Sequence, residues 1–193
     1  MSKLVYINST SLDGYVEDET GAFDWVISDQ VHAFITELLQ PIRTYLYGRR
    51  LYETMAYFGT AAIEGYLPEH RDFARMWQKA EKIVFSRTLT GVTTPNTRVE
   101  RSFDLEAIRR LKGESEHDIS IGGAELAGLA LEADLLDECH LFINPVIVGG
   151  GKPAFRAALR RSLELLETCG LRTGVVRVHY RIRGGTPHEG LNS

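Results

Sequence analysis

Asp118-Ile-Ser-Ile-Gly-Gly-Ala-Glu-Leu-Ala-Gly-Leu-Ala-Leu-Glu132 is the stretch that decides the fold, because a β-branched run breaks into two glycines and then into helical spacing. The pattern predicts a strand, a tight turn and the beginning of a helix. Gly122 and Gly123 have no Cβ atoms, so a ligand can approach the backbone closely, and the free N–H groups where a helix begins favour an anion. A Gly-Gly pair between strand and helix is also ordinary turn chemistry, so the rest of the chain must decide between these interpretations.

Strand-like and helical patterns alternate along the chain, which predicts an α/β fold with a mostly parallel central sheet and helices on both faces. Besides the strand that begins at Asp118, strands are expected at 3–9, 44–47, 82–86, 97–99 and 140–148. The end of the chain differs, because 163–168 and 175–183 are strand-like with no helix between them and are expected to form an antiparallel hairpin. We expect a single domain over residues 1–183 and a flexible tail over 184–193.

Two segments show clear amphipathic periodicity. The first follows Ser28 and ends before Pro41, and its apolar residues have helical spacing: Val31, Phe34, Ile35, Leu38 and Leu39. The second is the last expected strand, in which Val176, Val178, Tyr180 and Ile182 alternate with Arg177, His179, Arg181 and Arg183. A period of two predicts that the apolar side of this strand is buried and that its charged side faces water.

The composition is that of an ordinary globular protein, with 44% hydrophobic and 25% charged residues among 193. The net charge of −4 supplies no basic field, so nucleic acid and anionic membranes are not expected partners. No stretch reaches the ~20 apolar residues of a membrane span and the N-terminus shows no signal pattern, so a cytoplasmic location is expected. Cys139 and Cys169 lack metal or redox spacing and are expected to be buried, reduced thiols.

Several familiar motifs are absent from the sequence. The segment after the first expected strand contains only Gly14, so it is not a GxGxxG dinucleotide fingerprint. Gly151-Lys152 is not part of a P-loop, because Pro153 stands at the Ser/Thr position and Val146 at the first glycine position. Neither an HExxH or Cys-His zinc pattern nor a GxSxG elbow is present. The sequence therefore predicts neither a metallohydrolase nor a serine hydrolase, and no metal site is expected.

Four segments stand where expected strands end: 9–15, 47–53, 85–89 and 121–126. Ligands of open parallel sheets bind beyond the carboxyl ends of the strands, so these segments are expected to meet at one site. Arg49, Arg50 and Arg87 would then share its rim, and guanidinium groups bind phosphate bidentately. Such a cluster favours the extra 2′-phosphate of NADPH over the ribose hydroxyl of NADH. Any one of these arginines alone is explained equally well as a solvated surface charge.

The order of these motifs resembles the dihydrofolate reductase-like family, which includes the C-terminal reductase domain of the bifunctional riboflavin-biosynthesis deaminase-reductase. The likeness covers nearly the whole chain. The segments that look like the riboflavin reductase are 11–14, 24–26, 123–138 and 144–149. Those that look like folate reductases are 47–53 and 84–87. The resemblance implies a dihydrofolate reductase-like sheet and an NADPH site formed by Gly48, Arg49, Arg50, Ser86, Arg87, Gly122, Gly123 and Ala124.

The chain departs from the family pattern at two places. Leu51 stands where folate reductases carry a phosphate-binding threonine, so one hydroxyl contact is missing. The helix carboxylate that assists the pterin in folate reductases would fall near Gln30, whereas Asp29 lies one position away. Asp29 is therefore kept as a candidate substrate-binding residue, but a folate substrate does not follow from it.

The remaining candidate residues lie in and after the first expected strand. Asp13 is the candidate catalytic residue, for orienting the substrate or relaying a proton, although an Asp before a Gly is very often only a turn former. Tyr15 and Trp25 are candidates for stacking on a heteroaromatic substrate, although aromatic residues in such loops equally often fill a core. Ser9 is expected to contact the nicotinamide amide.

The sequence thus predicts an NADPH-dependent reductase of a small heterocyclic or ribosyl-phosphate substrate, similar to the 5-amino-6-(5-phosphoribosylamino)uracil reductase of riboflavin biosynthesis. Two alternatives stay open: a dihydrofolate reductase-like enzyme acting on a pterin, and a non-catalytic NADP-binding homologue. The partner expected besides the small-molecule substrate is a second copy of the chain. The resemblance implies such a homodimer, formed through the strand 139–148 and the C-terminal hairpin.

Overall fold

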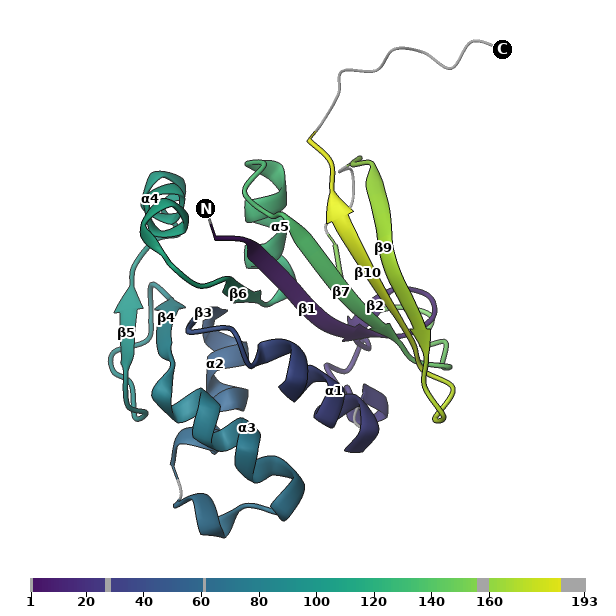
Figure 1. Cartoon of the computed structure of the whole chain (residues 1–193), viewed down its shortest axis with the longest axis horizontal. Coiled ribbons are helices and arrows are strands. Elements are labelled where there is room, and N and C mark those ends of the chain that lie inside the picture. Colours follow the sequence, from purple (N-terminus) through teal and green to yellow (C-terminus); the bar gives the residue numbers. More distant parts are fainter. Residues whose placement is uncertain (1, 27–28, 61, 156–159, 185–193) are drawn as a thin grey trace.

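The computed structural model of the chain describes residues 2–26, 29–60, 62–155 and 160–184. Among them, eight strands form one sheet in the order β5-β4-β3-β6-β1-β7-β10-β9 (Figure 1). The strands are β1 (Leu4–Thr10), β3 (Thr44–Gly48), β4 (Glu81–Phe85), β5 (Thr97–Glu100), β6 (Ile119–Gly122), β7 (Glu138–Ile143), β9 (Leu163–Gly170) and β10 (Val176–Ile182). The six strands from β5 to β7 are parallel, and the β9–β10 hairpin continues the sheet in antiparallel pairing. The predicted α/β fold with its antiparallel hairpin is therefore confirmed.

Helices cover both faces of the sheet, as expected (Figure 1). They are α1 (Asp29–Leu39), α2 (Arg49–Met55), α3 (Pro68–Lys79), α4 (Leu105–Glu114) and α5 (Ala124–Glu132). One core cluster joins the sheet to α4 and α5, and two others join its opposite face to α1, α2 and α3. Two short 3-10 helices, η2 (Ala56–Gly59) and η3 (Ile63–Gly65), occupy the loop before α3, and η1 (Asp24–Val26) precedes α1. No helix within the described residues is both long and apolar enough to cross a bilayer.

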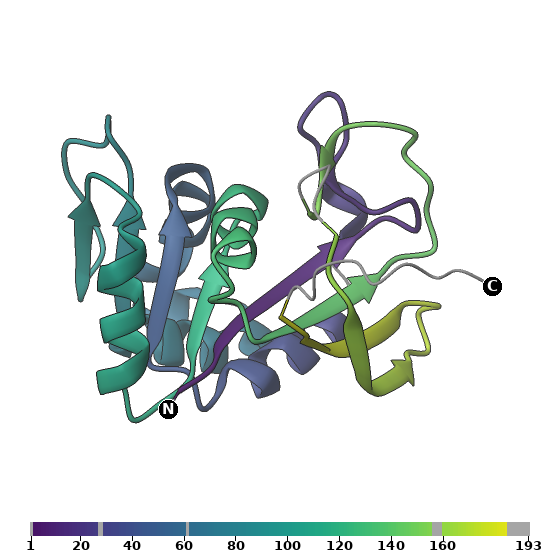
Figure 2. The same ribbon diagram turned by 90° about the horizontal axis from the view of Figure 1, so that it is seen from above.

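The two segments that follow β1 and β7 lie next to each other beyond the sheet, in purple and green in Figure 2. They carry two short strands that the sequence did not predict, β2 (Tyr15–Glu17) and β8 (Lys152–Pro153), which pair antiparallel. The backbone N–H of Leu12 also donates to the Val146 carbonyl at 2.8 Å. The loops after β1 and β7 are therefore held together as one structural unit.

The predicted strand 140–148 is wrong at both ends, because β7 begins at Glu138 and ends at Ile143. The Asn144 side-chain amide ends the pairing by donating to the carbonyls of Thr10 and Phe142 at 3.0 and 3.1 Å. Pro145 follows, and a residue without an N–H cannot continue a strand that lies between two neighbours.

The prediction of a wet charged side on the last strand is wrong at Arg177, although Arg181 and Arg183 are exposed as expected. Arg177 is only 2% exposed, whereas Val176 on the supposedly buried side is 41% exposed. The Arg177 guanidinium lies over the Phe34 ring of α1 at 4.8 Å and forms an ion pair with Glu167. Of the two cysteines expected to be buried thiols, both are free, but only Cys139 is fully buried and Cys169 is half-buried. The flexible tail predicted over 184–193 lies outside the described residues, apart from Gly184.

Candidate functional site

The sheet register brings three of the four predicted segments to neighbouring strand ends. Gly48 at the end of β3 pairs with Phe85 at the end of β4, and Tyr47 pairs with Gly122 at the end of β6. Arg49, Ser86 and Gly123 therefore follow adjacent strands at the carboxyl edge of the sheet. The fourth segment follows β1, which is the other neighbour of β6. Figure 2 shows the arrowheads of these parallel strands on the side where α2 and α5 begin.

The turn from β6 into α5 has the geometry of an anion cradle. Gly123 is the N-cap of α5 with φ 96° and ψ 126°, and no side chain caps the free N–H groups of the first turn. A Cβ atom built on Gly123 would meet nothing within 4 Å, so the space in front of these groups is open. A Cβ atom on Gly122 would lie 2.3 Å from Leu51 Cδ2, so α2 packs directly against this turn. Leu51, the residue that departs from the folate reductase pattern, therefore makes an apolar contact with this turn.

The two predicted phosphate-binding arginines at the beginning of α2 differ in their contacts and exposure. Arg49 is held between two partners, because its Nε donates to Glu53 at 2.7 Å and its Nη1 to the Thr88 hydroxyl at 3.0 Å. These contacts use two of the five N–H donors of a guanidinium. Arg50 is 83% exposed and lies 3.6 Å from the Glu17 carboxylate.

The turn after β4 is shaped by Ser86. Its buried hydroxyl accepts the backbone N–H groups of Thr88 and Leu89 at 3.3 and 3.0 Å. Its own hydroxyl proton is left for a further acceptor. Arg87 follows directly, and its carbonyl accepts a hydrogen bond from Arg101 at 3.4 Å.

Two buried polar atoms, one near the end of β1 and one in η1, have no hydrogen-bond partner among the described residues. They are the hydroxyl oxygen of Ser9 and the indole nitrogen of Trp25. Leaving such a group unpaired costs about 1–3 kcal/mol, so buried polar atoms in proteins nearly always find a partner. Ser9 stands two residues after Ile7, on the face of β1 that packs with α1. The structure shows no partner for either atom among the described residues.

Asp13 holds the loop after β7 in place. Its carboxylate accepts the backbone N–H groups of Val148 at 3.3 Å and Gly149 at 2.8 Å. A hydrogen bond with the Ser11 side chain and these two backbone bonds keep the pKa of Asp13 below its usual value. The carboxylate is therefore ionised at neutral pH and has no proton to donate. Its predicted part in catalysis stays a prediction, and the contacts that the structure shows are those of a clamp.

The other predicted substrate residues are placed less specifically. Tyr15 is half-buried in β2 and pairs with Pro153 of β8. Asp29 is the first residue of α1, but its side chain lies outside the described part of the structure. Trp25 lies in η1, immediately before α1.

Sequence reasoning missed Lys152 and Glu17. The Lys152 ammonium lies 3.8 Å from the Glu17 carboxylate and 3.8 Å from Glu125 in the first turn of α5. A flexible cation therefore stands close to the Gly122–Gly123 turn. The one sequence signal for Lys152 is that it directly follows Gly149, Gly150 and Gly151. This signal was not used, because the segment does not match a P-loop.

Two shallow hollows of about 440 and 400 Å³ lie at the amino ends of the strands instead. Lys79, Glu81 and Arg98 line the first, and Ile42, Arg75 and Ala80 are among the residues that line the second. Neither contains a residue of the predicted cofactor site. The unpaired Ser9 hydroxyl and the uncapped beginning of α5 are at the carboxyl edge, so we place the candidate site there.

Comparison with known proteins agrees with this fold and identifies the family. The family model described as the RibD C-terminal domain matches residues 2–177. The protein YyaP of Bacillus subtilis (strain 168) is 32% identical over 184 residues, which cover 91% of this chain and 93% of YyaP. A putative riboflavin biosynthesis protein from Shewanella sp. PV-4 has a similar structure, with a TM-score of 0.73, 20% identity and coverage of 94% and 99% of the two chains. Dihydrofolate reductase from Enterococcus faecalis, solved in complex with NADP(H), gives a TM-score of 0.64 at 16% identity, with coverage of 93% and 96%.

Proposed function

Because the chain belongs to the RibD C-terminal domain family, we propose that it is a cytoplasmic, NADPH-dependent reductase of a small heterocyclic or ribosyl-phosphate substrate. The proposed reaction type is that of 5-amino-6-(5-phosphoribosylamino)uracil reductase. This activity is one of the two named for a structurally similar deaminase/reductase from Thermotoga maritima. The single observation that carries the proposal is the meeting of Arg49, Ser86 and Gly123 at adjacent strand ends.

The described residues fit NADPH in two respects. The open space in front of Gly123 and the uncapped first turn of α5 suit the pyrophosphate, because free N–H groups and the helix dipole both stabilise an anion. Arg49, which Glu53 and Thr88 already orient, and the Ser86 hydroxyl would hold the 2′-phosphate. Lys152 would add a second cation near the pyrophosphate.

In this proposal the cofactor supplies the hydride, and the residues of the chain bind, orient and shield the reactants. The orphaned hydroxyl of Ser9 would bind the carboxamide of the nicotinamide, which would remove the cost of leaving it unpaired. Trp25 would present its unpaired indole N–H to an acceptor of the substrate. Asp13 would act by positioning, because it fixes the loop at 148–149 over this end of the sheet. Since Asp13 is ionised, the proton that accompanies the hydride would come from another donor, such as water.

The proposal is tested by titrating the protein with NADPH and with NADH while nicotinamide fluorescence is followed. We expect NADPH to bind more tightly, and Arg49→Ala to weaken NADPH more than NADH. The matched control is Arg75→Ala, which removes an exposed arginine from α3 at the opposite end of the strands. Equal loss of affinity for both cofactors in Arg49→Ala would show that the 2′-phosphate is bound elsewhere.

Two other functions remain distinguishable from the leading one. A pterin reductase would oxidise NADPH with dihydropterins but not with pyrimidine ribosyl compounds. A non-catalytic homologue would bind NADPH tightly and turn over neither class. The absent threonine hydroxyl at Leu51 is the observation that favours this second alternative.

We also propose that the chain forms a homodimer through the apolar side of the C-terminal hairpin. Leu163, Leu165 and Val176 project from this side and are each more than two-fifths exposed. Exposed apolar patches of this kind commonly mark an interface. Light scattering would measure the mass in solution, and Leu165→Glu is expected to convert a dimer to a monomer.

A further inference from the structure

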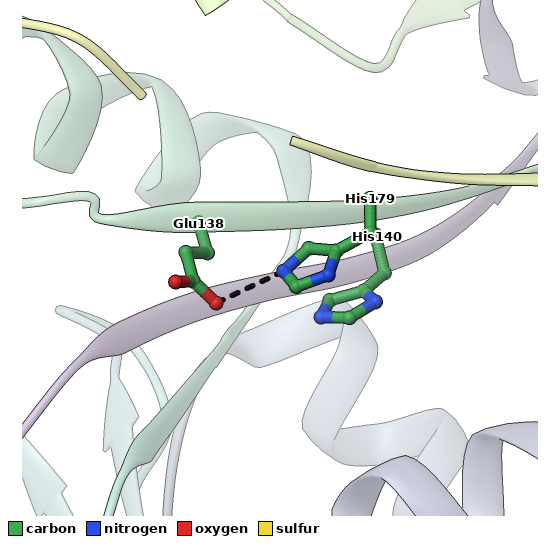
Figure 3. Close-up of side chains that lie close together, drawn as sticks. All are labelled: Glu138, His140 and His179. Atoms are coloured by element: carbon green, nitrogen blue, oxygen red, sulfur yellow. Dashed lines mark hydrogen bonds and ion pairs between the residues drawn. The ribbon is translucent and has the colours of Figure 1, made fainter. Parts of the chain in front are cut away.

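A buried polar cluster lies on the face of β7 and β10 that packs beside α1, next to β1, whose Ile7 pairs with His140. Glu138 and His140 are two residues apart on β7, so their side chains share one face of the sheet. His179 of β10 is paired directly with His140 across the strands. Figure 3 shows the two imidazole rings stacked with the Glu138 carboxylate beside them, and their centroids are 3.8 Å apart.

This cluster has the donor set of a transition-metal site. Glu138, His140 and His179 each offer one ligand atom, and these atoms lie within 4.8 Å of one another. Two imidazole nitrogens and one carboxylate oxygen are a common protein ligand set for Zn²⁺, with a fourth position left for water. Among the residues that the structure describes, this is the one group of three such ligands whose ligand atoms lie this close together. We propose that Glu138, His140 and His179 form a binding site for a divalent transition-metal ion of the Zn²⁺ type.

The required rearrangement is small for two of the three ligands. His179 Nε2 and a Glu138 oxygen are 2.9 Å apart and share a hydrogen bond. Two ligand bonds of about 2.0–2.1 Å at a tetrahedral angle span about 3.3–3.4 Å, so a metal ion replaces the shared proton if the pair separates by roughly half an ångström. His179 is partly exposed, with 16% of its side chain accessible, which gives an ion a route from solvent.

Two cations compete with the metal ion for these ligands. The Lys3 ammonium lies 2.8 Å from the other Glu138 oxygen, but half of the Lys3 side chain is exposed, so it can turn into water. The buried Arg177 guanidinium contacts His140 Nδ1 at 3.2 Å and also forms the ion pair with Glu167. Metal binding through His140 requires Arg177 to keep Glu167 and release the imidazole. A competing cation gives the proposal a specific consequence, because removing Lys3 must strengthen metal binding.

The test uses the full chain without an affinity tag, freed of metal by a chelator, and does not involve NADPH. Zn²⁺ binding is measured by calorimetry, and the visible absorption of Co²⁺ reports its coordination geometry. We expect one equivalent to bind, His179→Gln and Glu138→Gln each to weaken binding at least tenfold, and Lys3→Ala to tighten it. Far-UV circular dichroism establishes that each variant is folded, and His179→Gln is chosen because an amide can still donate to Glu138.

The controls remove histidines that lie elsewhere. His117→Ala changes a histidine of the loop before β6, and His70→Ala changes one whose ring lies 4.4 Å from His32. Neither change is expected to alter the Zn²⁺ affinity. The proposal is overturned if the wild-type chain binds no Zn²⁺ below millimolar concentration, if His70→Ala abolishes binding while His179→Gln does not, or if Lys3→Ala weakens it.

Discussion

The Gly123→Ala substitution tests whether the turn before α5 serves a ligand or only the chain. Gly123 has φ 96° and ψ 126°, a conformation that residues with a Cβ atom rarely adopt. Forcing alanine into it is expected to cost about 1–3 kcal/mol of stability. For a domain of this size each kcal/mol lowers the melting temperature by about 2–4 °C, so the loss is measurable by thermal unfolding. The new methyl group would also enter the open space in front of the α5 N-terminus.

Cofactor binding is expected to suffer separately from stability. A hydrogen bond to a charged group contributes about 1.5–3 kcal/mol, so displacing the phosphate from one N–H would weaken NADPH about tenfold to a hundredfold. The matched control is Gly113→Ala, inside α4, where the new Cβ would meet nothing within 4 Å. That change is expected to stabilise the fold by about 0.4–1 kcal/mol. If Gly123→Ala melts earlier but binds NADPH as tightly as the wild type, the turn is structural and the cradle assignment is wrong.

Three further predictions concern the stability of the fold. Asp13→Asn should make the free energy of unfolding depend less on pH in acid. A carboxylate whose pKa is lowered in the folded state stabilises the fold above its usual pKa of 3.8, and this stabilisation is lost as the pH falls through the folded pKa. Urea unfolding midpoints measured from neutral to acid pH test this. Lys82→Met should cost about 1–3 kcal/mol in urea unfolding, since the buried ammonium donates to three carbonyls at the end of α3. Burial also lowers the pKa of Lys82 from 10.5 to about 8, so between pH 8 and 10.5 the unfolded chain binds more protons than the folded one. The free energy of unfolding of the wild type should therefore rise with pH over this range, whereas that of Lys82→Met should not. Tyr47→Phe should cost about 1–3 kcal/mol, because it leaves the buried indole N–H of Trp77 without an acceptor. Tyr45→Phe removes a buried hydroxyl that has no partner, so it should be neutral or stabilising. Equal losses of stability in thermal unfolding would refute this difference.

The sequence was informative wherever structure depends on local periodicity. The run from Ile119 through two glycines predicted a strand, a turn and a helix, and the ends of parallel strands predicted which distant segments would meet. The clamp at Asp13 could not be predicted in this way, because its partners Val148 and Gly149 are about 135 residues away. The two-stranded pairing of β2 with β8 has runs of only three and two residues, which are too short to show a period.

The buried charge on β10 shows a different limit of sequence patterns. Alternation identifies two sides of a strand, but it does not show what covers either of them. Arg177 is buried because α1 supplies Phe34 for its guanidinium plane and β9 supplies Glu167. Both partners depend on the tertiary structure, so the period of two was wrong at Val176 and Arg177, whereas Tyr180 and Ile182 pack against the core as expected.

The helices differ in how their N-termini are capped, and the uncapped ends that follow β3 and β6 lie at the candidate site. α4 begins at a side-chain cap, because the Asp104 carboxylate accepts two backbone N–H groups of the first turn. α3 begins at Pro68, whose missing N–H removes one donor that would need a partner. α2 and α5 begin instead at Gly48 and Gly123, with no side-chain cap, and follow the neighbouring strands β3 and β6. Two adjacent helix ends left without caps cost stability unless an external group satisfies them. In the proposed function, the phosphates of the dinucleotide would supply that group, and this would account for a chain that caps α4 but leaves α2 and α5 open.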